Sequence, residues 1–198
     1  MKNLPNILTL ARLALLPVIV LLLWPGIESR ETCFWAAALW AAGGTLDVVD
    51  GFIARRFNLV TVLGKFLDPL SDKLFYLVTL LALVQLDGPR VPVWVVMVTL
   101  VRELAVTGLR GIAASEGMVV AAGGMGKVKT SFASVGLIFL LIHYTYSIDF
   151  GLIQASLSFH RVGLWLTYIS VVFSLSSGLG YMSSFLKAHS AKVASTSS

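Results

Sequence analysis

Apolar residues run along this chain in six long stretches, which are separated by short polar segments containing Gly, Pro, Asn or Asp. A helix rises 1.5 Å per residue, so about 20 apolar residues cross the roughly 30 Å hydrocarbon core of a bilayer. Each stretch is about that long. We therefore predict an all-α integral membrane protein with six transmembrane helices and no other regular element. The predicted spans are residues 4–24, 33–53, 66–86, 91–114, 128–148 and 162–186.

The composition agrees with a chain that is surrounded by membrane lipid. Of its 198 residues, 57% are hydrophobic and only 13% are charged. A soluble domain carries roughly a quarter charged residues. Six spans use nearly the whole length, so we expect a single six-helix membrane domain over residues 1–190, followed by a disordered tail at 191–198. The single cysteine, Cys33, excludes a disulfide scaffold.

Lysine and arginine are distributed unequally between the two ends of the predicted spans. Nine lie on the side that holds both termini, and three lie on the other side. The positive-inside rule places the richer side in the cytoplasm. We therefore expect a multi-pass protein of the inner, cytoplasmic membrane with both termini in the cytoplasm. The nine residues are Lys2, Arg55, Arg56, Lys65, Arg110, Lys127, Lys129, Lys187 and Lys192.

Four aspartates interrupt the second and third stretches, although a charge at the centre of a spanning helix costs about 2.5–3.5 kcal/mol. Asp47 and Asp50 are three residues apart, and Asp68 and Asp72 are four apart, so each pair lies on one helix face. A short loop makes the two helices antiparallel, and the pairs can meet near the cytoplasmic surface. Four carboxylates at close range repel one another, and a divalent cation removes that repulsion. Oxygen ligands without His or Cys select Mg²⁺, Mn²⁺ or Ca²⁺ over zinc.

Small residues lie close to these aspartates on the same helix faces. Gly51 and Ala54 follow the first pair, and Gly64 precedes the second pair by one turn. They leave room for a polar group against the backbone, and Arg55 and Lys65 would meet its negative charge. Mg²⁺ commonly binds a few carboxylates together with substrate phosphates. These residues therefore indicate a site for a metal-bound phosphate ester.

The residues around the four aspartates match the signature of the CDP-alcohol phosphotransferase family. The plan of six spans resembles that family over essentially the whole chain. The resemblance implies an enzyme that displaces CMP from a CDP-linked lipid with an alcohol, using two metal ions, Mg²⁺ or Mn²⁺. It also implies that the four aspartates are metal ligands and that Asp72 is the base for the acceptor hydroxyl. Dimers are usual among such proteins, so we expect a homodimer. The matching signature is Asp47-x2-Asp50-Gly51-x2-Ala54-Arg55-x8-Gly64-x3-Asp68-x3-Asp72.

The resemblance further implies which residues bind the nucleotide lipid, CDP-diacylglycerol. Most of them belong to the signature or lie close to it. A segment at the amino terminus resembles a family segment that also touches the nucleotide. The implied residues are Asn6, Thr9, Gly51, Ala54, Arg55, Thr61 and Gly64.

Four basic residues of the fourth and fifth stretches are candidates for binding the acceptor alcohol. Arg102 and Arg110 are eight residues apart, within about 80° on one helix face, and Lys127 and Lys129 open the fifth stretch. We expect all four on the cytoplasmic side, where they suit an acceptor that carries a phosphate. Glu103 is placed to orient one of these basic side chains. The pattern resembles the branch of the family whose acceptor is glycerol 3-phosphate.

Other interpretations stay open for these residues. Ser131 follows Thr130 where members of that branch often carry a Gln, so inositol phosphate and phosphatidylglycerol are alternative acceptors. The basic residues also suit topology signals or contacts with anionic lipid. An ion-coupled transporter is the alternative of another class, because intramembrane carboxylates are common in transporters. Transport does not require small residues at the spacings of Gly51, Ala54 and Gly64. We expect no nucleic-acid partner.

Overall fold

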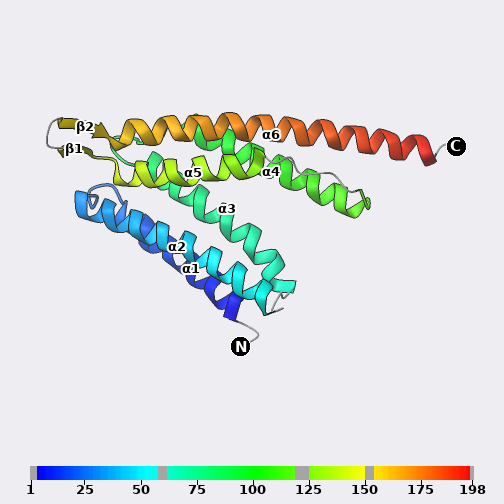
Figure 1. The fold of residues 1–198 in the computed structure, drawn as a ribbon, viewed down its shortest axis with the longest axis horizontal. Helices are drawn as coiled ribbons and strands as arrows, with labels where there is room; N and C mark the ends of the chain where they lie inside the picture. Colours follow the sequence, from blue (N-terminus) through cyan, green and yellow to red (C-terminus); the bar gives the residue numbers. More distant parts are fainter. Residues whose placement is uncertain (1–3, 58–61, 119–124, 150–153, 197–198) are drawn as a thin grey trace. The chain divides into compact units, whose positions relative to one another are not determined.

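The computed structural model describes residues 4–57, 62–118, 125–149 and 154–196. Within these ranges it contains six helices and one two-stranded sheet (Figure 1). Each helix overlaps one of the six predicted apolar stretches. The helices are α1 (Leu4–Leu22), α2 (Arg30–Arg56), α3 (Val62–Val84), α4 (Val93–Ser115), α5 (Met125–Ile142) and α6 (Phe159–Thr196).

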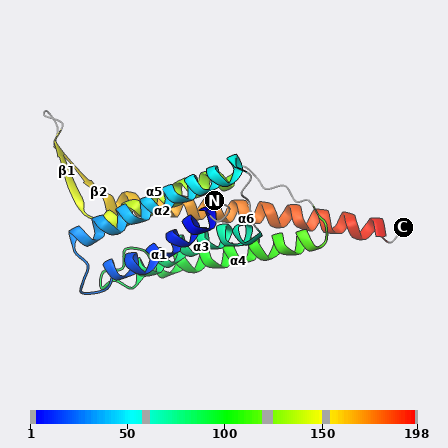
Figure 2. The same cartoon turned by 90° about the horizontal axis from the view of Figure 1, so that it is seen from below.

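A β-hairpin replaces the end of the fifth predicted span. α5 ends at Ile142, and the next residue, His143, has a left-handed φ of 61°. Strand β1 (Thr145–Asp149) then pairs antiparallel with β2 (Gln154–Ser158), and the hairpin connects α5 to α6 (Figure 2). The prediction that helices are the only regular elements is therefore wrong for this segment. Its run of Thr, Tyr, Ser and Ile favours an extended chain, because β-branched and aromatic side chains fit a pleated strand.

The last helix is longer than the predicted span. α6 continues to Thr196, although a disordered tail was expected from residue 191. Near its end, Lys192 Nζ donates to the backbone carbonyl of Glu116 at 2.8 Å and to its carboxylate at 2.6 Å. These bonds join the last turns of α6 to the segment that follows α4.

The chain falls into two compact units. The first contains residues 1–92 and 136–164, and the second contains residues 93–135 and 165–198. In the first unit, α1 packs against both α2 and α3. α2 begins with a capping box, in which Ser29 Oγ accepts from Thr32 N at 3.2 Å and Thr32 Oγ1 accepts from Ser29 N at 2.7 Å. Phe75 of α3 is fully buried and stacks on Trp40 of α2, with 5.8 Å between ring centroids.

The second unit contains α4, the first part of α5 and most of α6. Its helices are joined by aromatic pairs: Trp94 stacks on Tyr168 at 5.5 Å, and Phe132 stacks on Phe173 at 5.9 Å between ring centroids. α4 ends in a Schellman motif: Gly117 has a φ of 65°, its amide donates to the carbonyl of Ala114 at 3.2 Å, and the amide of Met118 donates to the carbonyl of Ala113 at 2.8 Å.

Apolar surface covers much of the described helices. Two segments are long and apolar enough to cross a membrane, Arg30–Ile53 in α2 and Phe159–Ser190 in α6, and shorter apolar helices cover Asn6–Leu22 and Val128–Ile142. Large apolar side chains point outward from them; Val48 is 70% exposed and Leu179 is 72% exposed. Exposed apolar area of this extent marks contact with a membrane or a partner. The structure is therefore that of a helical, membrane-associated protein.

Candidate active site

One arginine of α1 joins the first and fourth aspartates. Arg12 Nη1 lies 2.6 Å from Oδ1 of Asp47 in α2 and 2.6 Å from Oδ1 of Asp72 in α3. The arginine side chain is 7% exposed, whereas that of Asp72 is 55% exposed. The guanidinium lies 4.7 Å from the centre of the Phe75 ring. A single nitrogen therefore keeps carboxylates from two helices within two hydrogen-bond lengths of each other.

A hydroxyl on the same face of α1 lies between the other two aspartates. Thr9 Oγ1 is 3.2 Å from Asp50 Oδ2 and 3.3 Å from Asp68 Oδ1. Thr9 precedes Arg12 by three residues, which places both side chains on one helix face. A hydroxyl has one proton, so Thr9 can donate to only one of the two carboxylates at a time. The four aspartates thus form two pairs that each connect α2 to α3.

The donor atoms of these pairs fit a hard divalent cation. All four side chains supply carboxylate oxygens, the ligand type that Mg²⁺ and Mn²⁺ prefer. Among the described residues, no group of three or more His, Cys, Asp or Glu has metal-binding geometry as it stands. In the structure the aspartates lie as two pairs, one beside Arg12 and one beside Thr9. The residues that would hold metal are Asp47, Asp50, Asp68 and Asp72.

The residues predicted to bind the nucleotide are described in part. Gly64 of α3 is buried, and Gly51 of α2 is partly buried. Asn6 lies partly buried in the first turn of α1, on the helix that carries Thr9 and Arg12. Thr61 and the side chains of Ala54 and Arg55 lie outside the described part of the chain.

In the second unit, Glu103 joins two of the predicted acceptor-binding residues. Its Oε1 accepts from Arg102 Nη1 at 2.8 Å and also from Lys129 Nζ. Arg102 Nε donates to the carbonyl of Ser174 at 2.9 Å, and Nη2 donates to Ser177 Oγ at 3.1 Å. Arg102 therefore connects α4 to α6, in addition to contributing positive charge.

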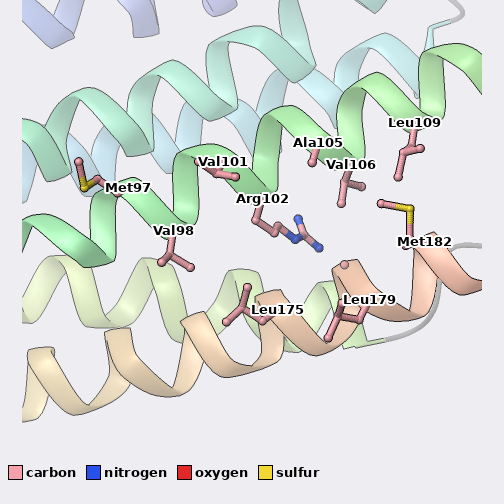
Figure 3. A pocket seen from close by; sticks show the side chains of 11 residues that line it. Met97, Val98, Val101, Arg102, Ala105, Val106, Leu109, Leu175, Leu179 and Met182 are labelled. Carbon is pink, nitrogen blue, oxygen red and sulfur yellow. The ribbon is translucent and has the colours of Figure 1, made fainter.

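Arg102 also lines an apolar groove of about 400 Å³ between α4 and α6 (Figure 3). The guanidinium points between the two helices, where Gly178 leaves space: a Cβ on that glycine would lie 3.4 Å from Arg102 Cγ. Arg110 is exposed, and its guanidinium lies 5.5 Å from the centre of the Tyr181 ring. The side chain of Lys127 lies outside the described part. The groove wall includes Met97, Val101, Leu175, Leu179 and Met182.

Arg12 is the site residue that the sequence analysis did not single out. Its signal was present, because it is a charged residue within an apolar stretch and lies three positions after Thr9. Its two partners could not be predicted from the sequence, because they lie 35 and 60 residues away along the chain.

Fold and site together define a helical, membrane-associated protein in which four aspartates of α2 and α3 lie in two pairs beside α1. The chain belongs to the CDP-alcohol phosphatidyltransferase family, whose model matches residues 2–176. Proteins of this family generally depend on divalent metal.

Three curated relatives illustrate the range of similarity. A CDP-diacylglycerol–glycerol-3-phosphate 3-phosphatidyltransferase of Bacillus subtilis is 42% identical over 193 residues, which cover 92% of this chain and 95% of that protein. A Rickettsia typhi protein of the same name is 37% identical over 143 residues, or 72% and 78% of the two chains. A cardiolipin synthase (CMP-forming) of Streptomyces coelicolor is 38% identical over 111 residues, or 56% and 51%.

Proposed function

We propose that this chain transfers the phosphatidyl group of CDP-diacylglycerol to glycerol 3-phosphate, giving phosphatidylglycerophosphate and CMP for phospholipid biosynthesis. The observation that carries the reaction class is the pairing of the four signature aspartates between α2 and α3. The choice of acceptor is supported by similarity to the Bacillus subtilis relative over nearly the full length of both chains. Family membership favours this enzyme over an ion-coupled transporter.

The four aspartates have two roles in the proposed reaction, binding of metal and, for Asp72, general-base catalysis. The acceptor oxygen forms a bond to the lipid-linked phosphorus while the bond from that phosphorus to CMP breaks, and CMP leaves with the electron pair. Asp72 takes the proton of the acceptor hydroxyl; its side chain is 55% exposed, which allows an acceptor to approach it. General-base help of this kind contributes about 10²–10⁴-fold. Two divalent ions, Mg²⁺ or Mn²⁺, held by the four aspartates would supply positive charge for the attacking and leaving oxygens.

The substrates are assigned to two groups of residues. Gly51, Ala54 and Gly64 have small side chains or none, which allows the CDP group to approach the backbone. Arg55 supplies positive charge for its phosphates. Asn6, Thr9 and Thr61 complete that group, and Thr9 also lies between Asp50 and Asp68. The phosphate of the acceptor is assigned to Arg102, Arg110, Lys127 and Lys129. Sequence topology supports this assignment, because it places both groups on the cytoplasmic side.

The finer membrane topology is part of the same proposal. Six spans form one catalytic domain in the inner membrane, with both termini and the active site in the cytoplasm, and the active form is a homodimer. The support for the orientation is the ratio of nine to three basic residues between the two sides. Reaction of single introduced cysteines with an impermeant thiol reagent would test it, since Cys33 is buried. Labelling of loop positions from the opposite side would contradict it.

The reaction itself is tested by release of CMP from labelled CDP-diacylglycerol by the purified protein. We expect release only when Mg²⁺ or Mn²⁺ and an acceptor are both present, and fastest with glycerol 3-phosphate. No release with any acceptor would contradict the proposed activity.

A second candidate acceptor is phosphatidylglycerol, because one relative is named a cardiolipin synthase. The same assay separates the candidates when glycerol 3-phosphate, phosphatidylglycerol and inositol phosphate are supplied one at a time. Glycerol 3-phosphate and inositol phosphate both carry a phosphate for the basic residues, whereas phosphatidylglycerol offers its phosphate within a lipid. A preference for phosphatidylglycerol would favour that lipid as the acceptor and would leave the proposed reaction class unchanged.

A further inference from the structure

We propose that Arg12 is a positioning residue of the metal site. It holds Oδ1 of Asp47 and Oδ1 of Asp72, and the second oxygen of each carboxylate would then serve as a ligand or, in Asp72, as the base. The inference rests on the metal site proposed above and adds a residue from α1 to it. Arg12 itself acts through the two aspartates and takes no part in the transfer.

The burial of Arg12 shows that its position is built into the fold. The residue is 6% exposed and its guanidinium lies against Phe75, which is fully buried. Arg12 Nε is a buried donor with no hydrogen-bond partner among the described residues. An unpaired buried donor costs free energy. The two bonds that Nη1 makes must therefore offset this cost if the guanidinium is to stay buried. Those bonds are both to signature aspartates, each at 2.6 Å.

A second buried arginine of the same unit provides the contrast. Arg90 is 2% exposed and donates to Glu28, to Cys33 Sγ and to the carbonyls of Leu140 and Leu141. Those partners belong to helix ends and connections, and none is a signature residue. Arg90 therefore serves the packing of the unit, and it offers a matched control for Arg12.

Charge and geometry explain what Arg12 adds. Asp47 and Asp72 come from different helices, and two carboxylates at this separation repel one another. A guanidinium between them removes that repulsion and fixes the rotation of both groups. Ligating carboxylates are commonly held by such outer hydrogen bonds, and loss of the outer partner costs about 10–100-fold in metal affinity. Thr9 Oγ1 lies between Asp50 and Asp68 and donates to one of them at a time, so α1 contacts both pairs.

The test is Mn²⁺ binding to the purified, substrate-free protein, measured by electron paramagnetic resonance of the unbound ion. We expect Arg12→Gln to weaken binding about 10–100-fold. Arg12→Lys should recover part of the loss, since an ammonium keeps the charge but lacks the planar guanidinium that lies over Phe75. Arg90→Lys should bind Mn²⁺ as the wild type does, and circular dichroism would show that each variant is folded.

Each outcome decides the proposal. Folded Arg12→Gln protein that binds Mn²⁺ as tightly as the wild type, or more tightly, would overturn it. If Arg12→Gln does not fold, Arg12→Lys carries the test, and wild-type affinity in that variant would overturn the proposal. Asp50→Asn distinguishes failure of the Arg12 proposal from failure of the proposed metal site. If Asp50→Asn loses Mn²⁺ binding and the Arg12 variants keep it, the metal site is supported and the role of Arg12 is refuted. Absence of Mn²⁺ binding by the wild type would overturn both.

Discussion

Two neighbouring glycines of α2 provide a matched test of how packing supports the aspartates. A Cβ on Gly43 would lie 2.4 Å from Cζ and 2.9 Å from Cε1 of Phe75. Phe75 cannot turn away easily, because it is fully buried, stacks on Trp40 at 5.8 Å and lies under Arg12 at 4.7 Å. A Cβ on Gly44 would meet nothing within 4 Å. Substitution by alanine should therefore have opposite effects at the two positions.

The size of the difference follows from two terms. In Gly43→Ala, the ring of Phe75 must retreat by about 1 Å to reach ordinary carbon contact, and overpacking of this kind costs about 1–3 kcal/mol. Replacing glycine by alanine inside a helix gains up to about 1 kcal/mol, and both variants share that gain. We expect Gly44→Ala to be more stable than the wild type by up to about 1 kcal/mol. Gly43→Ala should be less stable than Gly44→Ala by about 1–3 kcal/mol.

The single thiol of the chain supplies the assay. Cys33 is fully buried, so a thiol-reactive fluorescent dye should report unfolding on heating in detergent. We expect melting temperatures in the order Gly44→Ala, wild type, Gly43→Ala. Gly43→Ala should also bind Mn²⁺ more weakly, because displacement of Phe75 moves the guanidinium that rests on it. Equal stability of the two variants would refute the packing argument.

Three further predictions concern the site and the segment after α5. Asp72→Asn should abolish CMP release while CDP-diacylglycerol binding stays measurable by calorimetry; unchanged turnover would remove Asp72 from the mechanism. Arg110→Ala should raise the KM for glycerol 3-phosphate more than the KM for the lipid substrate, and equal shifts in both would favour a topology role. Burial, with the charges of Arg90 and His160, lowers the pKa of His143 from 6.5 to about 4. The unfolded chain then binds a proton that the folded chain does not, so stability should fall as the pH drops from about 6.5 to 4. His143→Asn, which tolerates the left-handed φ of 61°, should flatten this dependence of melting temperature on pH; an unchanged slope would contradict the assignment.

The hairpin shows where a pattern of apolar residues stops being informative. Residues 128–148 are apolar enough for a span, and hydropathy does not distinguish a helix from a strand. The helix ends because His143 adopts a left-handed conformation, and Thr145 to Asp149 pair with Gln154 to Ser158. That pairing is a contact between two segments, and neither segment specifies it alone.

The basic residues show a similar limit. Sequence spacing placed Arg102 and Arg110 on one helix face. The structure gives them different surroundings: Arg102 bonds to Glu103, Ser174 and Ser177, and Arg110 lies exposed against Tyr181. The phosphate-binding assignment therefore stays a prediction, and Arg110→Ala tests it for the exposed arginine.

The sequence by itself determined the six helices, the local pairing of the aspartates and the family, because each depends on spacing along a helix or on composition. Helical periodicity is a local property, so Asp47 with Asp50, and Asp68 with Asp72, could be placed on common faces without a structure. Only the tertiary structure decided which aspartate of α2 meets which aspartate of α3, and that Thr9 and Arg12 hold them. These contacts join residues 35 to 60 positions apart, and they exist because α1 packs against both helices and buries a guanidinium between two carboxylates.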